Sequence, residues 1–152
     1  MHENQKARIL VIDDDEGIRK VITTALSNEG YITDTASTGK EAIQKSNANF
    51  YNLALIDIRL PDMDGTKLLT AMKETIPEMR KIILTGYPAL QNSIEALNKG
   101  AHGYLVKPLN MDELLHAVEE NLEKQREAKE YGQQAVTGFV ETRLRELETE
   151  KK

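Results

Sequence analysis

The sequence contains no cysteine, which excludes disulfide bonds, thiolate zinc sites and thiol catalysis. It has no run near the roughly 18 apolar residues that a membrane span needs, and its opening MHENQKAR lacks the apolar core of a signal peptide. An excess of positive charge is missing too: the net charge is −5, which argues against direct binding of nucleic acid or anionic membranes. No Gly-x-x-x-x-Gly-Lys-Ser/Thr loop supports nucleotide hydrolysis. We therefore expect a soluble, cytoplasmic protein.

The 152 residues, 39% of them hydrophobic and 30% charged, suit one domain with a sizeable core and an appendage. Short apolar runs alternate with helical patterns, which predicts a doubly wound α/β fold with helices on both faces of a parallel sheet. Strands are expected at residues 8–13, 31–36, 51–57, 81–85 and 103–107. The second strand alternates polar and apolar residues, which is typical of an edge strand. The predicted strand order is therefore 2-1-3-4-5, as in flavodoxin-like folds.

Helical periodicity predicts the elements between these strands. Apolar residues recur at helical spacing over residues 18–26, 68–76, 90–97 and 111–122, and more weakly over 39–47. Gly30 and Gly100 are placed to end two of the helices, and Pro77 to end the third.

The composition changes after Leu122, where charged residues predominate. We expect residues 1–125 to form the domain and 126–152 a charged helical tail, which is too short for a separate DNA-binding domain. Gly132 and Gly138 are expected to interrupt this tail. Val140, Leu144 and Leu147 share one helical face, together with Val136. The tail is either a helical extension that docks on a partner or on a second copy, or a frayed terminus.

Four predicted strands stop at chemically distinctive residues: Asp13 and Asp14, Asp57, Thr85, and Lys107. The carboxyl ends of parallel strands open into one crevice, so these side chains are expected to meet. Carboxylates about 4–5 Å apart repel by about 3–4 kcal/mol per pair at an effective dielectric near 20, so they must be protonated, separated or neutralised. Only oxygen ligands are at hand, which predicts Mg²⁺ or a similar hard cation.

Asp57 has the attributes of a carboxylate nucleophile, because an ionised aspartate can form an acyl phosphate without a general base. Phosphoryl transfer needs mainly positioning and charge stabilisation. Lys107 can supply a positive contact and Thr85 a hydroxyl hydrogen bond.

In these features the sequence resembles the receiver domain of two-component response regulators (CheY-like proteins). The resemblance spans residues 7–123 and rests on ILVIDDDEGIR at 9–19, ALIDIRLPDMDG at 54–65, IILTGY at 82–87 and GAHGYLVKPLNMDEL at 100–114. It implies that Asp57 is the phosphoacceptor, with a histidine kinase or phosphotransfer protein as donor. For Mg²⁺ it implies Asp14 as a direct ligand, Asp13 as a ligand largely through water, and the Arg59 carbonyl.

The resemblance also implies a switch. Thr85 would move toward the phosphate and Tyr104 would turn inward, and the Lys107–Pro108 peptide would be cis. The face formed by the fourth helix, fifth strand and fifth helix would then change its preference for an unknown downstream protein, or pair two copies of the chain. The chain is then no enzyme beyond its own phosphoryl transfer and autodephosphorylation.

Two alternative functions remain. A phosphorylation-independent interaction module would use the fold without the chemistry. An aspartyl-nucleophile phosphatase normally needs a carboxylate two residues after the nucleophile, where this sequence has Arg59. Asp15 is interpreted as a helix cap, and PDMDG at 61–65 as a turn opening the third helix rather than a calcium loop.

Overall fold

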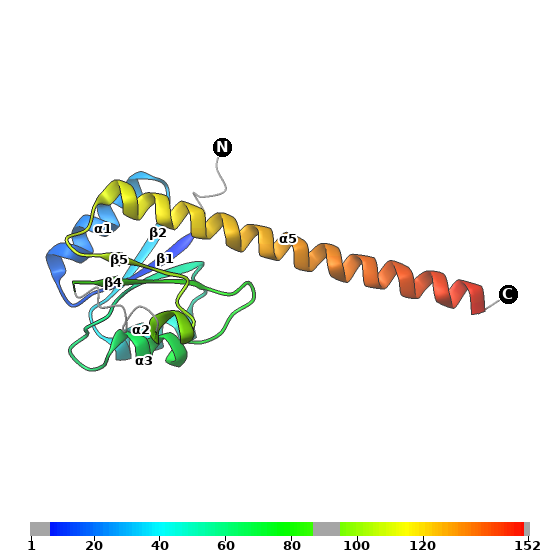
Figure 1. The fold of residues 1–152 in the computed structure, drawn as a ribbon, viewed down its shortest axis with the longest axis horizontal. Helices are drawn as coiled ribbons and strands as arrows, with labels where there is room; N and C mark the ends of the chain where they lie inside the picture. Colours follow the sequence, from blue (N-terminus) through cyan, green and yellow to red (C-terminus); the bar gives the residue numbers. More distant parts are fainter. Residues whose placement is uncertain (1–6, 87–94, 151–152) are drawn as a thin grey trace.

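The computed structural model describes residues 7–86 and 95–150, and a five-stranded parallel sheet forms its centre (Figure 1). The strands are β1 (Arg8–Ile12), β2 (Ile32–Ala36), β3 (Leu53–Asp57), β4 (Arg80–Thr85) and β5 (Gly103–Val106). Their order is β2-β1-β3-β4-β5 and each neighbouring pair is parallel. The predicted fold class, strand order and edge position of the second strand are therefore confirmed.

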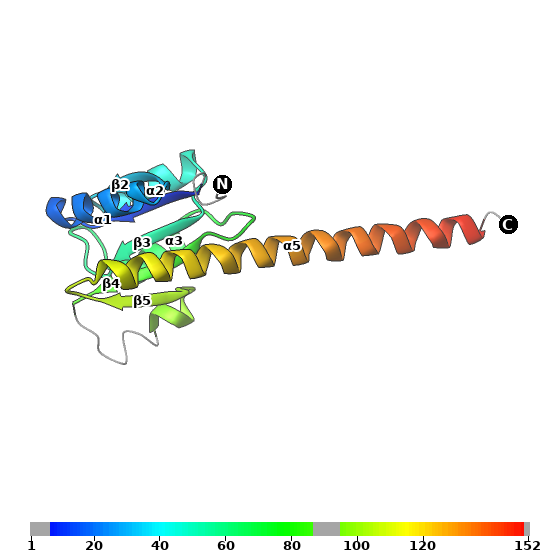
Figure 2. The same cartoon turned by 90° about the horizontal axis from the view of Figure 1, so that it is seen from above.

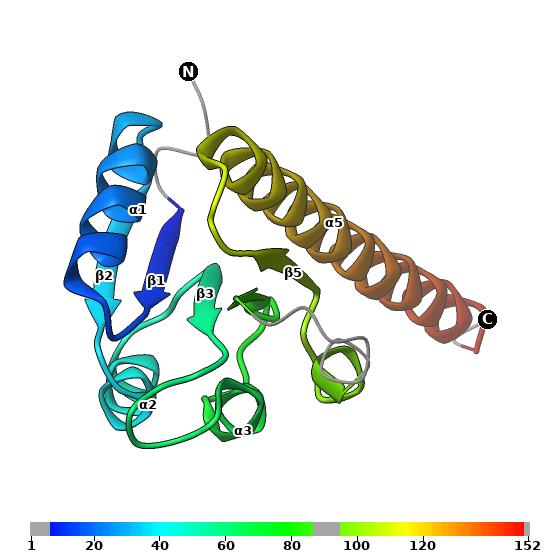
Figure 3. The same cartoon turned by 60° about the vertical axis from the view of Figure 1, so that its left-hand side comes forward.

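Helices cover both faces of this sheet, as predicted. The structure contains α1 (Glu16–Asn28), α2 (Gly39–Ala48), α3 (Gly65–Ala71) and α5 (Met111–Glu150). Figure 3 shows α1 and α5 on one side of the sheet and α2 and α3 on the other. The helix expected over residues 90–97 falls partly outside the described residues; 95–98 are helical, and Gly100 follows with φ 106°.

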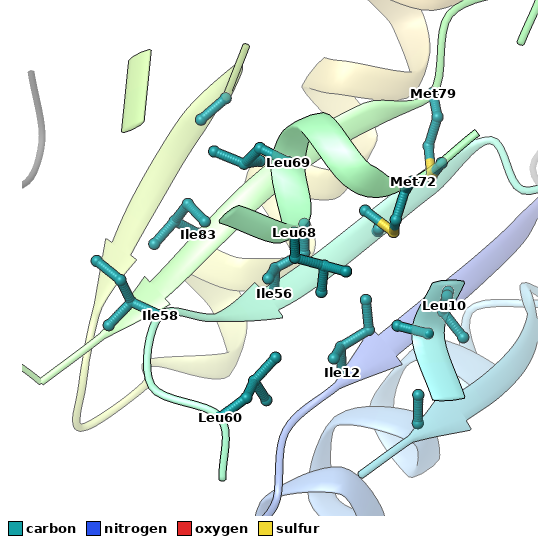
Figure 4. Close-up of a cluster of buried hydrophobic side chains, with 14 of the residues drawn as sticks. Leu10, Ile12, Ile56, Ile58, Leu60, Leu68, Leu69, Met72, Met79 and Ile83 are labelled. Atoms are coloured by element: carbon teal, nitrogen blue, oxygen red, sulfur yellow. The ribbon is translucent and has the colours of Figure 1, made fainter. Parts of the chain in front are cut away.

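The alternation of side chains along a strand explains why the central strands are continuously apolar. In β1, Leu10 and Ile12 belong to the core under α2 and α3, whereas Ile9 and Val11 belong to the core under α1 and α5. Figure 4 shows the first of these cores, in which Leu68 of α3 lies over the sheet. Both faces of β1 are buried, so a polar residue on either face would have to lose its hydration.

Side-chain caps fix where the helices begin. Asp15 accepts a hydrogen bond from the backbone amide of Ile18 and caps α1, as predicted. Thr38 caps α2 in the same way, and the Glu41 side chain accepts a hydrogen bond from the amide of Ser37, one residue before the cap.

Helix α3 is shorter than the periodicity over residues 68–76 indicated, and this prediction was wrong at its end. The helix stops at Ala71, and Ile76 is fully exposed rather than part of an apolar stripe. The amine of Lys81 donates to the carbonyl of Leu69 at 2.9 Å, while the amide of Lys73, which would otherwise reach that carbonyl, lies 3.5 Å from the Ser46 hydroxyl. The carbonyl that a further helical turn would use is thus bonded to a side chain from β4, and the helix ends before Pro77.

Helix α5 is one continuous helix of 40 residues. The expectation that Gly132 and Gly138 would interrupt it was therefore wrong. Its first half packs on the sheet and its second half projects beyond the body of the domain (Figure 2). Glycine lowers helix stability by about 1 kcal/mol but retains its backbone N–H, which is why it need not break a helix. Across residues 7–86 and 95–150, no helix combines the length and the apolar character needed to cross a membrane.

Candidate functional site

The carboxyl ends of β1, β3, β4 and β5 place the predicted site residues at one edge of the sheet. Ile12 is paired with Ile56, so the residues that follow β1 lie beside Asp57 at the end of β3. Asp57 is paired with Leu84, directly before Thr85. Thr85 is in turn paired with Val106, directly before Lys107. Strand register alone therefore brings together residues that are far apart in the sequence.

Three carboxylates form the centre of this edge. One oxygen from each of Asp13, Asp14 and Asp57 lies within 4.8 Å of the others. Asp13 is completely buried, Asp57 is 6% exposed and Asp14 is exposed. The buried Asp13 accepts a hydrogen bond from the amide of Asp15 at 2.9 Å, and its own amide donates to the carbonyl of Ala36 at 3.1 Å. The acid-rich loop after β1 is thus held on two sides.

Lys107 reaches into this cluster from the end of β5. Its amine lies 2.9 Å from an Asp13 carboxylate oxygen and 3.5 Å from one of Asp57. Burial by itself would lower the pKa of Lys107, but the hydrogen bond and charge of Asp13, together with Asp57, outweigh it and raise the pKa above 10.5. The side chain is therefore a fixed ammonium within the cluster.

The surroundings of Asp57 change the pKa of its carboxyl group. Burial raises the pKa of Asp57 above 3.8, and the charges of Asp13 and Asp14 add to the rise. The Arg59 amide, which donates to Asp57 at 3.2 Å, and the ammonium of Lys107 act in the opposite direction. A cation placed among the three carboxylates would favour the ionised form of Asp57.

The remaining predicted residues surround this centre. Thr85 is buried, and its carbonyl accepts a hydrogen bond from the Lys107 amide at 2.7 Å. The Lys107–Pro108 peptide is cis. Tyr104 lies on β5 opposite Ile83, with 40% of its surface exposed. The roles of Thr85 and Tyr104 as switch residues, and of the Arg59 carbonyl as a ligand, stay predictions.

The donor set fits a hard divalent cation. When ionised, three carboxylates and one ammonium leave about two negative charges in a mostly buried space, which a divalent cation would neutralise. The ligand atoms on offer are carboxylate oxygens, the type that Mg²⁺ prefers. The residues that would hold Mg²⁺ are Asp13, Asp14 and Asp57, with the Arg59 carbonyl predicted as a fourth.

Two residues of the loop after Asp57 were not singled out from the sequence. A Cβ on Gly65 would lie 2.5 Å from the carbonyl oxygen of Asp57, so only glycine fits there. Asp62, at the loop tip, accepts hydrogen bonds from the first amides of α2. The PDMDG sequence gave a turn, as predicted, but nothing in it signals a contact with a helix more than 20 residues earlier.

Comparison with known proteins gives the same family as the site. The sequence model for the response regulator receiver domain matches residues 9–119. Regulatory protein AtoC of Escherichia coli (strain K12) is 35% identical over 81% of this chain and 27% of its own length. DNA-binding transcriptional regulator NtrC of Proteus hauseri is 36% identical over 83% and 27%, respectively. The chain thus spans about a quarter of the length of these relatives.

Solved structures give the same picture. A response regulator receiver domain protein (CheY-like) from Methanospirillum hungatei JF-1 superposes with a TM-score of 0.77 at 43% identity, covering 80% of this chain and 98% of that one. NtrX from Brucella abortus gives 0.77 at 31% identity, covering 84% and 30%. The predicted resemblance is confirmed: the chain belongs to the family of response regulator receiver domains, the phosphorylation-dependent signalling modules of two-component systems.

Proposed function

We propose that Asp57 accepts a phosphoryl group from a histidine kinase or phosphotransfer protein, and that the phosphorylated chain changes its preference for protein partners. One observation carries the proposal: the ammonium of Lys107 lies between the buried carboxylates of Asp13 and Asp57 at the end of the sheet. An ammonium held among acidic side chains can bind phosphoryl oxygens through charge-assisted hydrogen bonds, whereas a buried ion pair adds little to the stability of a fold. A cytoplasmic location, as expected for the family, belongs to the same proposal.

The residues of the site divide the chemistry among them. The ionised Asp57 oxygen attacks phosphorus, the new oxygen–phosphorus bond forms as the bond to the donor breaks, and the donor keeps the electron pair. Lys107 and the Thr85 hydroxyl contact the phosphoryl oxygens. Mg²⁺, held by Asp13, Asp14, Asp57 and the Arg59 carbonyl, supplies neutralisation of charge on the transferred group when it is bound.

The output follows from the added charge. A phosphoryl group carries nearly two negative charges in place of the carboxylate's one, together with strong acceptor oxygens. Thr85 moves toward it and Tyr104 turns inward, so the surface of β5 changes. Tyr104 and Val106 are 40% and 43% exposed on this strand. Together with α5 and the helix expected over residues 90–97, this strand is the face proposed to bind the downstream protein.

The domain division predicted from the sequence is part of the proposal. Gln125 is the last buried residue among the described positions of α5, which supports a receiver domain over 1–125 and a tail over 126–152. The tail carries Arg and Lys in near balance with Glu, so it offers no footprint for nucleic acid. We include pairing of two copies, through the tail or through the β5 face, among its partners.

The first test is phosphorylation by acetyl phosphate. We expect one acid-stable, hydroxylamine-sensitive phosphoryl adduct that requires Mg²⁺, and Asp57→Asn should abolish it because the amide is not a nucleophile. Asp15→Asn is the matched control, since asparagine caps a helix as well as aspartate does. Mass spectrometry of the intact chain measures the adduct. An adduct that persists on Asp57→Asn would refute the assignment.

The same experiment separates the alternatives. Steady turnover of a phosphate ester would revive the phosphatase, although Arg59 stands where its second carboxylate is needed. Absence of binding to both Mg²⁺ and fluoroberyllate would favour an interaction module that does not use phosphorylation.

A further inference from the structure

The loop that follows Asp57 makes an excursion away from the sheet and returns to it. The amide of Gly65 donates to the carbonyl of Ile58 at 2.7 Å, and the amide of Leu60 donates to the carbonyl of Met63 at 3.2 Å. These two bonds close the loop like a small hairpin. Residues 61–62 lie between these bonded pairs and form the tip of the loop.

The tip is tied to the beginning of α2 by Asp62. One carboxylate oxygen of Asp62 accepts from the amide of Gly39 at 2.8 Å, and the other accepts from the amide of Lys40 at 2.9 Å. These are amides of the first helical turn, which have no partner within the helix. Thr38, the cap of α2, satisfies the Glu41 amide instead, so Asp62 and Thr38 do not compete.

An apolar contact reinforces this tie. Met63 packs against the core at the position of Gly39, where an added Cβ would lie 2.4 Å from the Met63 sulfur. The absence of a side chain at Gly39 therefore allows the loop to approach α2 closely. The tip is held by two charge-assisted hydrogen bonds and by a packed methionine.

The segment 36–40 is also bonded to the loop that carries Asp13 and Asp14. The carbonyl of Ala36 accepts from the amide of Asp13 at 3.1 Å. A short stretch of chain thus connects the loop that carries Asp13 and Asp14 with the loop that follows Asp57. The two loops that flank the carboxylates are thus joined through this segment as well as through the pairing of β1 with β3.

We propose that Asp62 is a positioning residue for the cation site: its bonds to Gly39 and Lys40 hold the loop after Asp57 in register with the acids after β1. Asp62 does not touch the cation or the phosphoryl group. This inference rests on the proposed function, because it assigns Asp62 a part in binding Mg²⁺ at the same site.

The test measures Mg²⁺ binding to the full chain. The chemical shifts of backbone amide resonances in a Mg²⁺ titration report the affinity. Asp62→Ala should weaken Mg²⁺ binding by roughly fivefold, because Mg²⁺ binding would then have to restore the loop position that the two helix-capping bonds hold in the wild type. Asp62→Asn should stay within about twofold of the wild type, because the amide oxygen still accepts one of the two bonds and asparagine is as good a cap as aspartate. With acetyl phosphate, Asp62→Ala should need more Mg²⁺ for half-maximal rate but reach nearly the same maximal rate.

The outcomes separate the two proposals. Equal Mg²⁺ affinity of Asp62→Ala and the wild type overturns the positioning role, whether or not the chain is phosphorylated. Equal losses in Asp62→Ala and Asp62→Asn also overturn it, because the first variant removes both bonds and the second keeps one. If the wild type binds Mg²⁺ with the expected order of variants but forms no adduct, the phosphoacceptor assignment fails and the positioning role stands.

Discussion

At the residue scale, Lys107 explains how three carboxylates can share one edge of the sheet before any cation arrives. Asp13 is fully buried, and burying an unpaired charge costs several kcal/mol. The ammonium of Lys107 lies 2.9 Å from Asp13 and offsets part of this cost. The same ammonium is only 3.5 Å from Asp57, so it is already in place for a group that adds charge there.

Gly65 sets how closely the start of α3 approaches the phosphoacceptor strand. A Cβ there would lie 2.5 Å from the Asp57 carbonyl oxygen and 2.8 Å from the Cα of Ile58, and backbone atoms cannot rotate away. We expect Gly65→Ala to lower the free energy of unfolding by about 1–3 kcal/mol, as overpacking does, measured by urea denaturation. Gly132→Ala is the control, because nothing lies within 4 Å of its position on α5. Equal midpoints for wild type and Gly65→Ala would contradict the predicted clash.

His102 makes the stability of the chain depend on pH. Its Nδ1 accepts from the Lys81 amide at 2.9 Å, which requires an unprotonated nitrogen. Burial, with the nearby positive charge of Arg80, lowers the pKa of His102 below 6.5 despite the opposing charge of Glu78. Below about pH 6.5 the unfolded chain therefore binds a proton that the folded chain does not, and stability is lost as the pH falls.

The variant His102→Asn tests this dependence, because asparagine can accept the same hydrogen bond and does not titrate in this range. We expect the wild type to lose more stability than the variant between about pH 8 and about pH 5. Urea denaturation at each pH measures the difference. A difference in free energy that stays constant across this range would contradict the assignment.

At the element scale, the strands were predictable, and so were the start of α1 at Asp15 and its end near Gly30, but the end of α3 and the length of α5 were not. Runs such as RILVI and LALID are apolar on both faces, which few elements other than a covered parallel strand require. The residues at the ends of these strands could be placed in one crevice because the register follows from the fold. The site was therefore largely predictable from strand ends alone.

The end of α3 depends on a contact that periodicity cannot show. Leu68, Leu69 and Met72 do bury as the pattern predicts, but the helix ends at Ala71 and the amine of Lys81 bonds to the Leu69 carbonyl there. The tie between Asp62 and α2 escaped prediction for the same reason. Both are tertiary contacts of polar side chains with helix ends, and hydrophobic spacing carries no information about them.

The middle of α5 is bonded to the edge of the sheet opposite the acid cluster, and the tail begins directly after these bonds. The Gln125 amide nitrogen donates to the carbonyls of Asn52 and Glu78 at 2.9 Å and 2.7 Å. Asn121 accepts from the guanidinium of Arg80 at 3.0 Å. These bonds hold the middle of α5 against the starts of β3 and β4, directly before the tail leaves the body of the domain.

At the scale of the whole molecule, the tail presents an apolar stripe that the body does not cover. Val140, Leu144 and Leu147 lie on one face and are 47%, 55% and 39% exposed. Two glycines lower the stability of the projecting part of α5, and most helical stability in proteins comes from packing, so a partner along this stripe would stabilise it. Arg143 lies on one flank of the stripe, and Glu148 lies on the other, so a parallel copy would bring these two side chains together.

We therefore expect the full chain to sediment as a dimer at concentrations of tens of micromolar, with pairing through the tail. Leu144→Lys should return it to a monomer, because a charge in the paired stripe must be desolvated or excluded. Thr142→Lys is the matched control: it adds the same charge to the opposite face of α5 and should leave the dimer intact. Sedimentation velocity, with and without fluoroberyllate, measures the mass. A wild-type chain that sediments as a monomer under both conditions would rule out pairing through the tail, and identical dimers from both lysine variants would place the interface elsewhere, with the exposed face of β5 the next surface to test.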